Sequence, residues 1–373
     1  MNYKKNENYS INELKYFLSN ERINDIFIVT GEKSFFRSGA SKLFKEILKN
    51  KKVKFFFKKS AYPEIGELRI LYKKLREFSP ELILAIGGGS VIDYAKMANL
   101  NGIDYKLEKI IKDNSYKISG NFRKLIAVPT TAGSGAEVTS NAVIYINKIK
   151  YSVEGDKLKP FTYFLVPEII IKNKKTLKAS AGFDAISQAV ESIISVKSTK
   201  QSLIYATKSL DFSLKSYLEF IKKPTLTNTT NMSLAALYSG KAISISKTTA
   251  PHAVSYPFTS LYNISHGHAV SLTLEKFLKF NFVNSEKRIA KFDIKKRYFK
   301  LFSIFKVKTI YELEKKIILL KKNANLTDDF RKLNINIDSN IEKILKGVNL
   351  MRLGNNPVKL EKNDIKNIIK NNF

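Results

Sequence analysis

The stretch LILAIGGGS, residues 82–90, decides the fold. Five consecutive apolar residues are typical of a β-strand covered on both faces, as in a parallel sheet. The glycines after it let backbone N–H groups approach a ligand, and a following helix would turn its positive end toward an anion. A tight turn would not require three glycines, so we favour phosphate binding. The run does not match GxGxxG, the dinucleotide fingerprint. Ser90 and Asp93 fit a capping box for the next helix.

Short apolar runs and amphipathic stretches alternate on both sides of this motif, which is typical of βαβ units. After residue 165 the pattern changes to long helical segments. We therefore predict an α/β nucleotide-binding domain over residues 1–165 and an all-helical domain over residues 166–373. Further strands are predicted at 26–29 and 53–57. Helices are predicted at 38–48, 64–78, 182–195, 200–221, 232–245, 268–280, 311–322 and 341–351, with a last one over 359–373.

A second strand-to-loop transition is LIAVPTTAGSGAEVT, residues 125–139. Its hydroxyl groups, on Thr130, Thr131 and Ser134, can donate hydrogen bonds to a nucleotide. Two such loops after successive parallel strands would meet at the carboxyl edge of one sheet, where ligands bind in folds of this class. The pair of loops predicts a single nucleotide site.

The chain has only three histidines, His252, His266 and His268. Asp184 and Gln188 are four residues apart on a predicted helix, so they project from one face. Spacing alone does not define a metal site here. Polar pairs at this spacing more often form a solvated helix face, and neighbouring histidines more often belong to a turn with satisfied hydrogen bonds.

Composition restricts the classes of function. Cysteine is absent, which excludes disulfides and thiolate metal sites, and no apolar run is long enough to span a bilayer. The N-terminus has no apolar leader, so we expect a cytoplasmic protein without membrane partners. The formal net charge is +32, which raises nucleic acid as a partner, but only nine of the 65 basic residues are Arg. An Arg-poor, Lys-rich chain favours compositional drift over nucleic-acid recognition.

The motifs together resemble the signature regions of the iron-containing (group III) alcohol dehydrogenase family. The resemblance rests on four segments in order: GGGSVIDYAK, VPTTAGSGAEVT, GFDAISQAVES and PHAVSYPFTSLYNISHGHAV. It implies an N-terminal dinucleotide-binding domain, a C-terminal helical domain, a nicotinamide cofactor and a metal ion. Carried over by position, the implied cofactor residues are Gly31, Gly88, Gly89, Ser90, Asp93, Thr130, Thr131, Ser134 and Lys150. The implied metal ligands are Asp184, Gln188, His252 and His266.

The sequence departs from the family pattern at two of these positions. Most members have His where this chain has Gln188, and an amide oxygen is a poorer ligand than imidazole for Fe²⁺ or Zn²⁺. Such a site should bind metal more weakly, or not at all, in which case His252 and His266 would polarise the carbonyl by hydrogen bonding. Tyr256 stands where many members have a second His for proton transfer. Either Tyr256 takes that role, or protons pass through His268.

The sequence around Gln188, DAISQAVES, is similar to that of the family members known as phosphonoacetaldehyde reductases, which make 2-hydroxyethylphosphonate. The resemblance thus implies NAD(P)H-dependent reduction of a small anionic aldehyde, and close relatives imply a homodimer. Gly31 stands where members often carry an acidic residue that would repel the 2′-phosphate of NADP. Because this carboxylate is missing, the site should accept NADP as well as NAD. Lys247, Thr248 and Thr249 are candidates for binding the phosphonate. Reduction of uncharged or sugar-derived aldehydes, a lyase or cyclase on the related dehydroquinate-synthase-like scaffold, and a basic binding protein remain alternatives.

Overall fold

The computed structural model describes residues 10–101, 107–113 and 120–370. The chain divides into two compact units. The first comprises Met1–Thr131 with Gly135–Asn173, and the second comprises Ala132–Ser134 with Lys174–Phe373. The division therefore falls after residue 173, whereas the sequence pattern placed it after residue 165.

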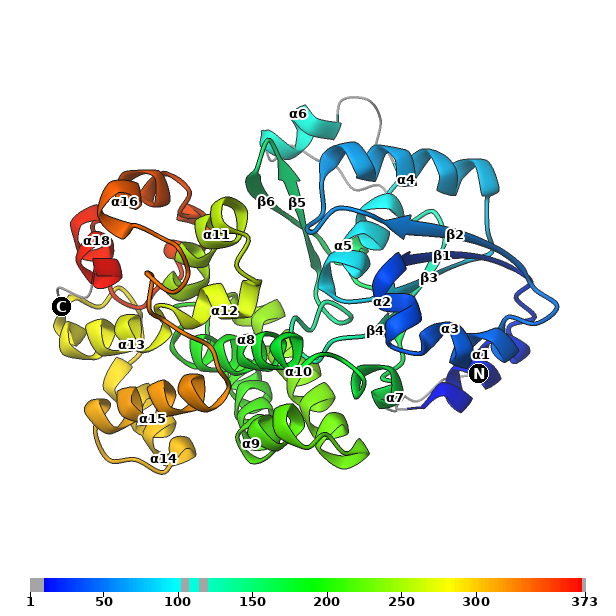
Figure 1. Ribbon diagram of the computed structural model, residues 1–373. Coiled ribbons are helices and arrows are strands. Elements are labelled where there is room, and N and C mark those ends of the chain that lie inside the picture. Colours follow the sequence, from blue (N-terminus) through cyan, green and yellow to red (C-terminus); the bar gives the residue numbers. More distant parts are fainter. Residues whose placement is uncertain (1–9, 102–106, 114–119, 371–373) are drawn as a thin grey trace. The chain divides into compact units, whose positions relative to one another are not determined.

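The first unit is built on a five-stranded parallel sheet with strand order β2-β1-β3-β4-β7 (Figure 1). The expected strands at 26–29, 53–57 and 82–86 are confirmed as β1, β2 and β3. An antiparallel hairpin of β5 and β6 stands apart from this sheet. The strands are β1 (Asp25–Gly31), β2 (Lys52–Lys58), β3 (Leu82–Gly87), β4 (Lys124–Pro129), β5 (Asn141–Ile146), β6 (Ile149–Glu154) and β7 (Thr162–Tyr163).

The central strand β3 is buried along its whole length, as its unbroken apolar sequence predicts. Ile83 and Ala85 face one side of the sheet and pack in a cluster with residues of α4 and α5. Leu82 and Leu84 alternate with them and are equally buried. The helices and 3-10 turn of this unit are α1 (Ile11–Asn20), α2 (Glu32–Arg37), α3 (Ala40–Ile47), α4 (Ile65–Phe78), α5 (Gly89–Ala98), α6 (Leu107–Lys112), η1 (Asp156–Leu158) and α7 (Pro167–Ile170).

The helix expected at 38–48 is confirmed as α3, and the chain also forms α2 directly after β1, which the sequence pattern did not predict. The capping box predicted for α5 is wrong. Helix α5 begins at Gly89 with Gly88 as its N-cap and without a side-chain cap. Ser90 therefore lies inside the helix and forms no capping box with Asp93. The Asp93 carboxylate instead accepts a hydrogen bond from the Val143 N–H at 3.1 Å.

Helix α5 also carries a buried cation, Lys96. Its Nζ donates to the Thr139 carbonyl at 2.9 Å, the Thr139 hydroxyl at 2.8 Å and the Asn141 carbonyl at 2.9 Å. The Asp93 carboxylate lies 4.0 Å from the same nitrogen. This side chain thus ties α5 to the segment that leads into β5.

The regular elements of the second unit are all helices in the part of the chain that is described, as expected, apart from an isolated β-bridge between Arg288 and Val358. Two predicted helices are each interrupted: the one over 268–280 is divided between α12 and α13, and the one over 341–351 between α16 and α17. Residues 371–373 of the predicted last helix lie outside the described residues. The elements are α8 (Lys175–Ile194), α9 (Lys200–Lys222), α10 (Leu226–Ser246), α11 (Ala250–Tyr262), α12 (His266–Ser271), α13 (Leu274–Val283), η2 (Ser285–Lys287), α14 (Ile294–Phe305), α15 (Ile310–Asn323), α16 (Ile337–Lys346), α17 (Leu350–Leu353) and α18 (Lys362–Lys370).

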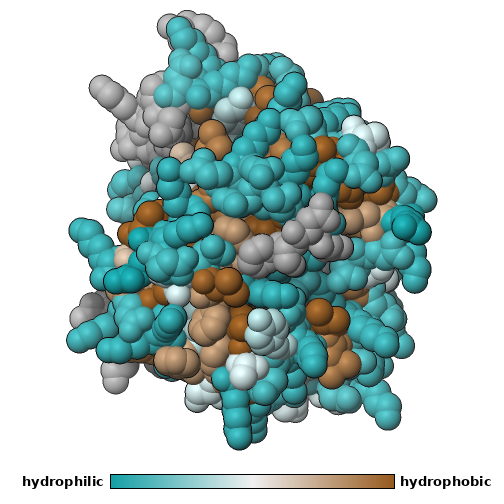
Figure 2. Space-filling view, turned by 90° about the vertical axis from the view of Figure 1, so that its left-hand side faces the viewer, coloured by the Kyte–Doolittle hydropathy of each residue, from teal (hydrophilic) through white to brown (hydrophobic). Residues whose placement is uncertain are grey.

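Polar residues dominate the face drawn in Figure 2, and apolar side chains are scattered among them. Among the described residues, no helix combines the length and the apolar character that crossing a membrane requires.

Candidate functional site

The two predicted loops meet at the carboxyl edge of the sheet. Gly87 pairs with Pro129 at the ends of β3 and β4, and the Thr130 N–H donates to the Gly87 carbonyl at 3.0 Å. A Cβ atom added to Gly88 would lie 3.3 Å from the Thr131 hydroxyl oxygen. The first N–H groups of α5, a helix of ten residues, begin at this turn. A turn without side chains beside a helix N-terminus fits a pyrophosphate.

The other expected cofactor residues occupy different elements. Gly31 ends β1 and caps α2, and a Cβ atom there would lie 2.7 Å from the Ser34 hydroxyl oxygen. Lys150 lies on β6, and its charge is one of the influences on the pKa of Asp93. Ser134 belongs to the second unit, where its carbonyl faces Gln188. The roles of these residues in cofactor binding stay predictions.

Helix α8 carries a buried stripe of polar side chains, Asp184, Gln188 and Glu191. Their spacing of four and then three residues places them on one face of the helix. Buried polar groups require partners, so the stripe needs matching polar groups on the helices packed against it. Glu191 was not among the residues expected from the sequence, although its spacing from Asp184 and Gln188 was the signal that would have found it.

Asp184, His252 and His266 form the candidate metal centre. One ligand atom from each residue lies within 4.8 Å of the others, and the His252 Nε2 lies 3.2 Å from the Asp184 Oδ1. Two ligands of a tetrahedral ion at about 2.0–2.2 Å are separated by roughly 3.3 Å. One carboxylate and two imidazoles are a donor set that Fe²⁺ and Zn²⁺ accept. The three residues present therefore fit a divalent metal.

Gln188 joins this cluster as a hydrogen-bond donor. Its Nε2 lies 3.3 Å from the Asp184 Oδ2 and 3.4 Å from the Ser134 carbonyl, both of which are acceptors. Its Oε1 accepts from the Ser239 hydroxyl at 2.9 Å. The amide oxygen is thus turned away from Asp184. The role of Gln188 as a metal ligand stays a prediction, and this arrangement favours a three-ligand centre with an orienting amide.

We expect replacement of Gln188 by His to strengthen zinc binding on the order of tenfold or more, because imidazole is the better ligand. The affinity of the folded protein for Zn²⁺ can be measured by competition with a chromophoric chelator. Gln188→Leu removes the amide without adding a ligand and is the matched control. Equal affinities of wild type and Gln188→His would contradict the expectation.

Glu191 holds His252 from the side opposite Asp184. One carboxylate oxygen of Glu191 contacts the His252 Nδ1, and the other accepts from the Thr249 N–H at 2.7 Å and the Thr249 hydroxyl at 2.9 Å. Burial alone would lower the pKa of His252, but the charges and hydrogen bonds of Glu191 and Asp184 outweigh it and raise that pKa to about 10.

The remaining expected residues surround the cluster. Tyr256 is buried on α11, with its ring centroid 6.0 Å from that of His266. The His268 Nε2 lies 2.7 Å from the Thr327 carbonyl, and burial lowers the pKa of His268. Lys247 adopts a φ of 60° at the end of α10, and the Thr248 carbonyl accepts from the Asn355 side chain at 3.1 Å. None of these roles is tested by the geometry.

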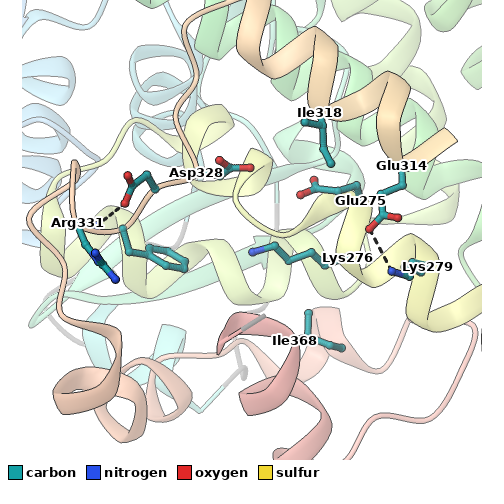
Figure 3. A pocket seen from close by; sticks show the side chains of 10 residues that line it. Glu275, Lys276, Lys279, Glu314, Ile318, Asp328, Arg331 and Ile368 are labelled. Atoms are coloured by element: carbon teal, nitrogen blue, oxygen red, sulfur yellow. Dashed lines mark hydrogen bonds and ion pairs between the residues drawn. The ribbon is translucent and has the colours of Figure 1, made fainter. Parts of the chain in front are cut away.

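A separate cavity of about 610 Å³ lies in the helical unit and is lined mainly by charged residues (Figure 3). Asp328, Glu275 and Lys276 point toward a common space in this view. Two of these lining residues accept from the buried Lys321 Nζ, Glu275 at 2.6 Å and Asp328 at 2.9 Å. Since Asp184, His252 and His266 do not line this cavity, it is distinct from the candidate metal centre.

Comparisons with known proteins identify the class. The family model described as iron-containing alcohol dehydrogenase matches residues 5–171, and the C-terminal model of the same family matches residues 178–373. The chain belongs to the iron-containing alcohol dehydrogenase family.

Two curated relatives illustrate the range of this family. The chain is 30% identical over 221 residues to a phosphonoacetaldehyde reductase of Streptomyces viridochromogenes, covering 57% of this chain and 56% of the relative. It is 29% identical over 202 residues to a 4-hydroxybutyrate dehydrogenase of Clostridium kluyveri, covering 53% and 54%. The matched region thus spans about half the length of either relative.

Solved structures show the same fold. A sulfoacetaldehyde reductase from Bifidobacterium kashiwanohense, solved in complex with NAD⁺, aligns with a TM-score of 0.84 at 23% identity. The alignment covers 100% of this chain and 98% of that one. An alcohol dehydrogenase from Oenococcus oeni aligns with a TM-score of 0.87 at 21% identity, covering 98% of each chain.

Proposed function

We propose that the protein reduces a small anionic aldehyde to its primary alcohol with NADPH or NADH. The observation that carries the proposal is the cluster formed by the buried Asp184 and His252 with the half-buried His266, in a chain of this family. When bound, the metal would polarise the carbonyl oxygen as a Lewis acid and the nicotinamide would supply the hydride.

The protein's own residues would hold and orient these groups. Asp184, His252 and His266 would bind the ion, and the Gln188 amide would keep the Asp184 carboxylate in place. The glycine turn before α5 would receive the cofactor pyrophosphate, with Thr130 and Thr131 beside it. Tyr256, buried near His266, is the candidate for delivering the proton to the developing alkoxide.

Phosphonoacetaldehyde is the proposed substrate. The compounds named for three relatives, phosphonoacetaldehyde, sulfoacetaldehyde and 4-hydroxybutyrate, each carry an anionic group. Of the three candidate phosphonate ligands, Thr249 already donates through both its N–H and its hydroxyl to Glu191. Lys247 and Thr248 therefore remain the candidates. We also propose a cytoplasmic homodimer, on the basis of the resemblance.

The test follows oxidation of NADPH and of NADH with phosphonoacetaldehyde and with propanal, an uncharged aldehyde. We expect kcat/KM for phosphonoacetaldehyde to be at least about tenfold higher, corresponding to ~1.4 kcal/mol of transition-state binding. The advantage should shrink as salt rises, because the positive field of the chain is screened. Chelation should lower the rate and added Fe²⁺ should restore it.

The outcomes separate the alternatives. A preference for propanal would assign the chain to reductases of uncharged aldehydes. Turnover without net consumption of NADPH would assign it to the lyases or cyclases of the related scaffold. Salt-sensitive nucleic-acid affinity without cofactor binding would indicate a basic binding protein.

A further inference from the structure

We infer that Glu191 is a positioning residue that, anchored by Thr249, selects the nitrogen through which His252 binds metal. A carboxylate accepts hydrogen bonds and donates none, so the His252 Nδ1 beside it must carry a proton. The lone pair of a neutral ring is then on Nε2, the nitrogen 3.2 Å from Asp184. The inference rests on the metal site of the proposed function, but it does not depend on which aldehyde is reduced.

Glu191 can act in this way because it is itself immobilised. The side chain is fully buried, and its second oxygen accepts two hydrogen bonds from Thr249. Thr249 is the N-cap residue of α11, yet its hydroxyl makes no capping hydrogen bond to that helix. The Thr249 hydroxyl instead donates its proton to Glu191.

The connection between α10 and α11 is held at several further points. The Asn355 side chain donates to the Thr248 carbonyl at 3.1 Å, and the Ser195 hydroxyl donates to the Ser246 carbonyl at 2.5 Å. Lys247 between them adopts a left-handed φ of 60°, which is costly for a residue with a Cβ. The anchored connection sets the position of His252, which lies in the first turn of α11. Second ligand shells of this kind orient imidazole and raise its basicity.

A purely structural role for Glu191 would be to tie α8 to α11 and nothing more. The two roles differ in what they predict for the folded protein. A tie between helices would lower the stability of the metal-free protein and leave its affinity for metal unchanged. A positioning role changes the affinity and the protonated nitrogen of His252.

The test uses the full chain and Zn²⁺ alone, without aldehyde or cofactor, so failure of the proposed reduction would not affect it. In Glu191→Gln, the Thr249 donors will retain the amide oxygen and turn the amide NH₂ toward His252. The Nδ1 then becomes an acceptor and the proton moves to Nε2. We expect zinc affinity to fall about 10- to 100-fold. Thr249→Val keeps the backbone donor to Glu191, so its zinc affinity should fall less. Glu219→Gln, on the exposed side of α9, is the control and should bind zinc as tightly as wild type.

Ring-¹⁵N-labelled histidine reports the protonated nitrogen directly, since the chain has only three histidines to assign. The wild-type zinc form should show His252 protonated at Nδ1 and bound through Nε2, and zinc-free Glu191→Gln should show a proton on Nε2. The inference is overturned if the wild type binds no zinc, if zinc is bound through Nδ1, or if Glu191→Gln binds zinc within about twofold of wild type.

Discussion

Replacement of Gly267 by alanine is expected to destroy the metal centre. Gly267 follows His266 on α12, and a Cβ atom there would lie 1.9 Å from the Ser180 carbonyl oxygen and 2.9 Å from the Asp184 Cβ. Neither atom belongs to a flexible side-chain end, so α12 must move away from α8. His266 moves with its helix and leaves Asp184. We expect zinc affinity to fall by more than about 100-fold, which exceeds the usual loss when a residue that hydrogen-bonds to a metal ligand is replaced. The free energy of unfolding should fall by about 1–3 kcal/mol because the added methyl group overpacks the contact.

The measurement pairs chelator competition with chemical denaturation. Gly66→Ala is the matched control, because Gly66 lies on α4 and a Cβ atom there meets nothing within 4 Å. This control should be neutral or gain up to about 1 kcal/mol from helix propensity. If Gly267→Ala retained wild-type zinc affinity, the close packing of α12 on α8 would be refuted.

Replacement of Lys96 by methionine should produce the largest loss of stability in the first unit. The substitution removes three hydrogen bonds from a fully buried ammonium group and leaves the Asp93 carboxylate buried without its nearest cation. Breaking a buried pair in this way costs about 3–5 kcal/mol. The double variant Asp93→Asn, Lys96→Met should recover part of that loss. Urea denaturation of the three proteins provides the test, and an unchanged midpoint for Lys96→Met would contradict it.

The same pair sets a pH dependence with a defined sign. Burial raises the pKa of Asp93 to about 6 and lowers the pKa of Lys96 to about 8. The stability contributed by Asp93 is complete below its unfolded pKa, near 3.8, and is lost as pH rises through 6. The stability contributed by Lys96 is complete above its unfolded pKa, near 10.5, and is lost as pH falls through 8. Asp93→Asn should remove the dependence between pH 4 and 6 in urea midpoints.

The parts of the fold that could be predicted were those specified by the residue pattern within a single segment. The unbroken apolar run before the triple glycine specified a central strand, since few other structures bury every residue of such a run. The helical unit followed from long segments with helical spacing. Local breaks were missed because tertiary contacts decide them. One example is the division between α12, which ends at Ser271, and α13, which begins at Leu274.

The candidate site could be predicted only in part. Asp184, His252 and His266 were identified through a resemblance, and the structure brings them together. The orientation of the Gln188 amide depends on Ser239 and Ser134, which are distant in sequence. Glu191 was missed although it shares the helical spacing of Asp184 and Gln188, because its partners Thr249 and His252 become adjacent only after folding.

The buried stripe on α8 has an evolutionary consequence. Position 188 contacts the Ser239 hydroxyl, the Ser134 carbonyl and the carboxylate of Asp184, so a side chain there lies directly beside the candidate ligands. Codons for glutamine and histidine differ at one base. A single transversion therefore separates this centre from one in which a third imidazole is the fourth ligand, and a lineage with this scaffold can change its dependence on metal supply without rebuilding the helices around it.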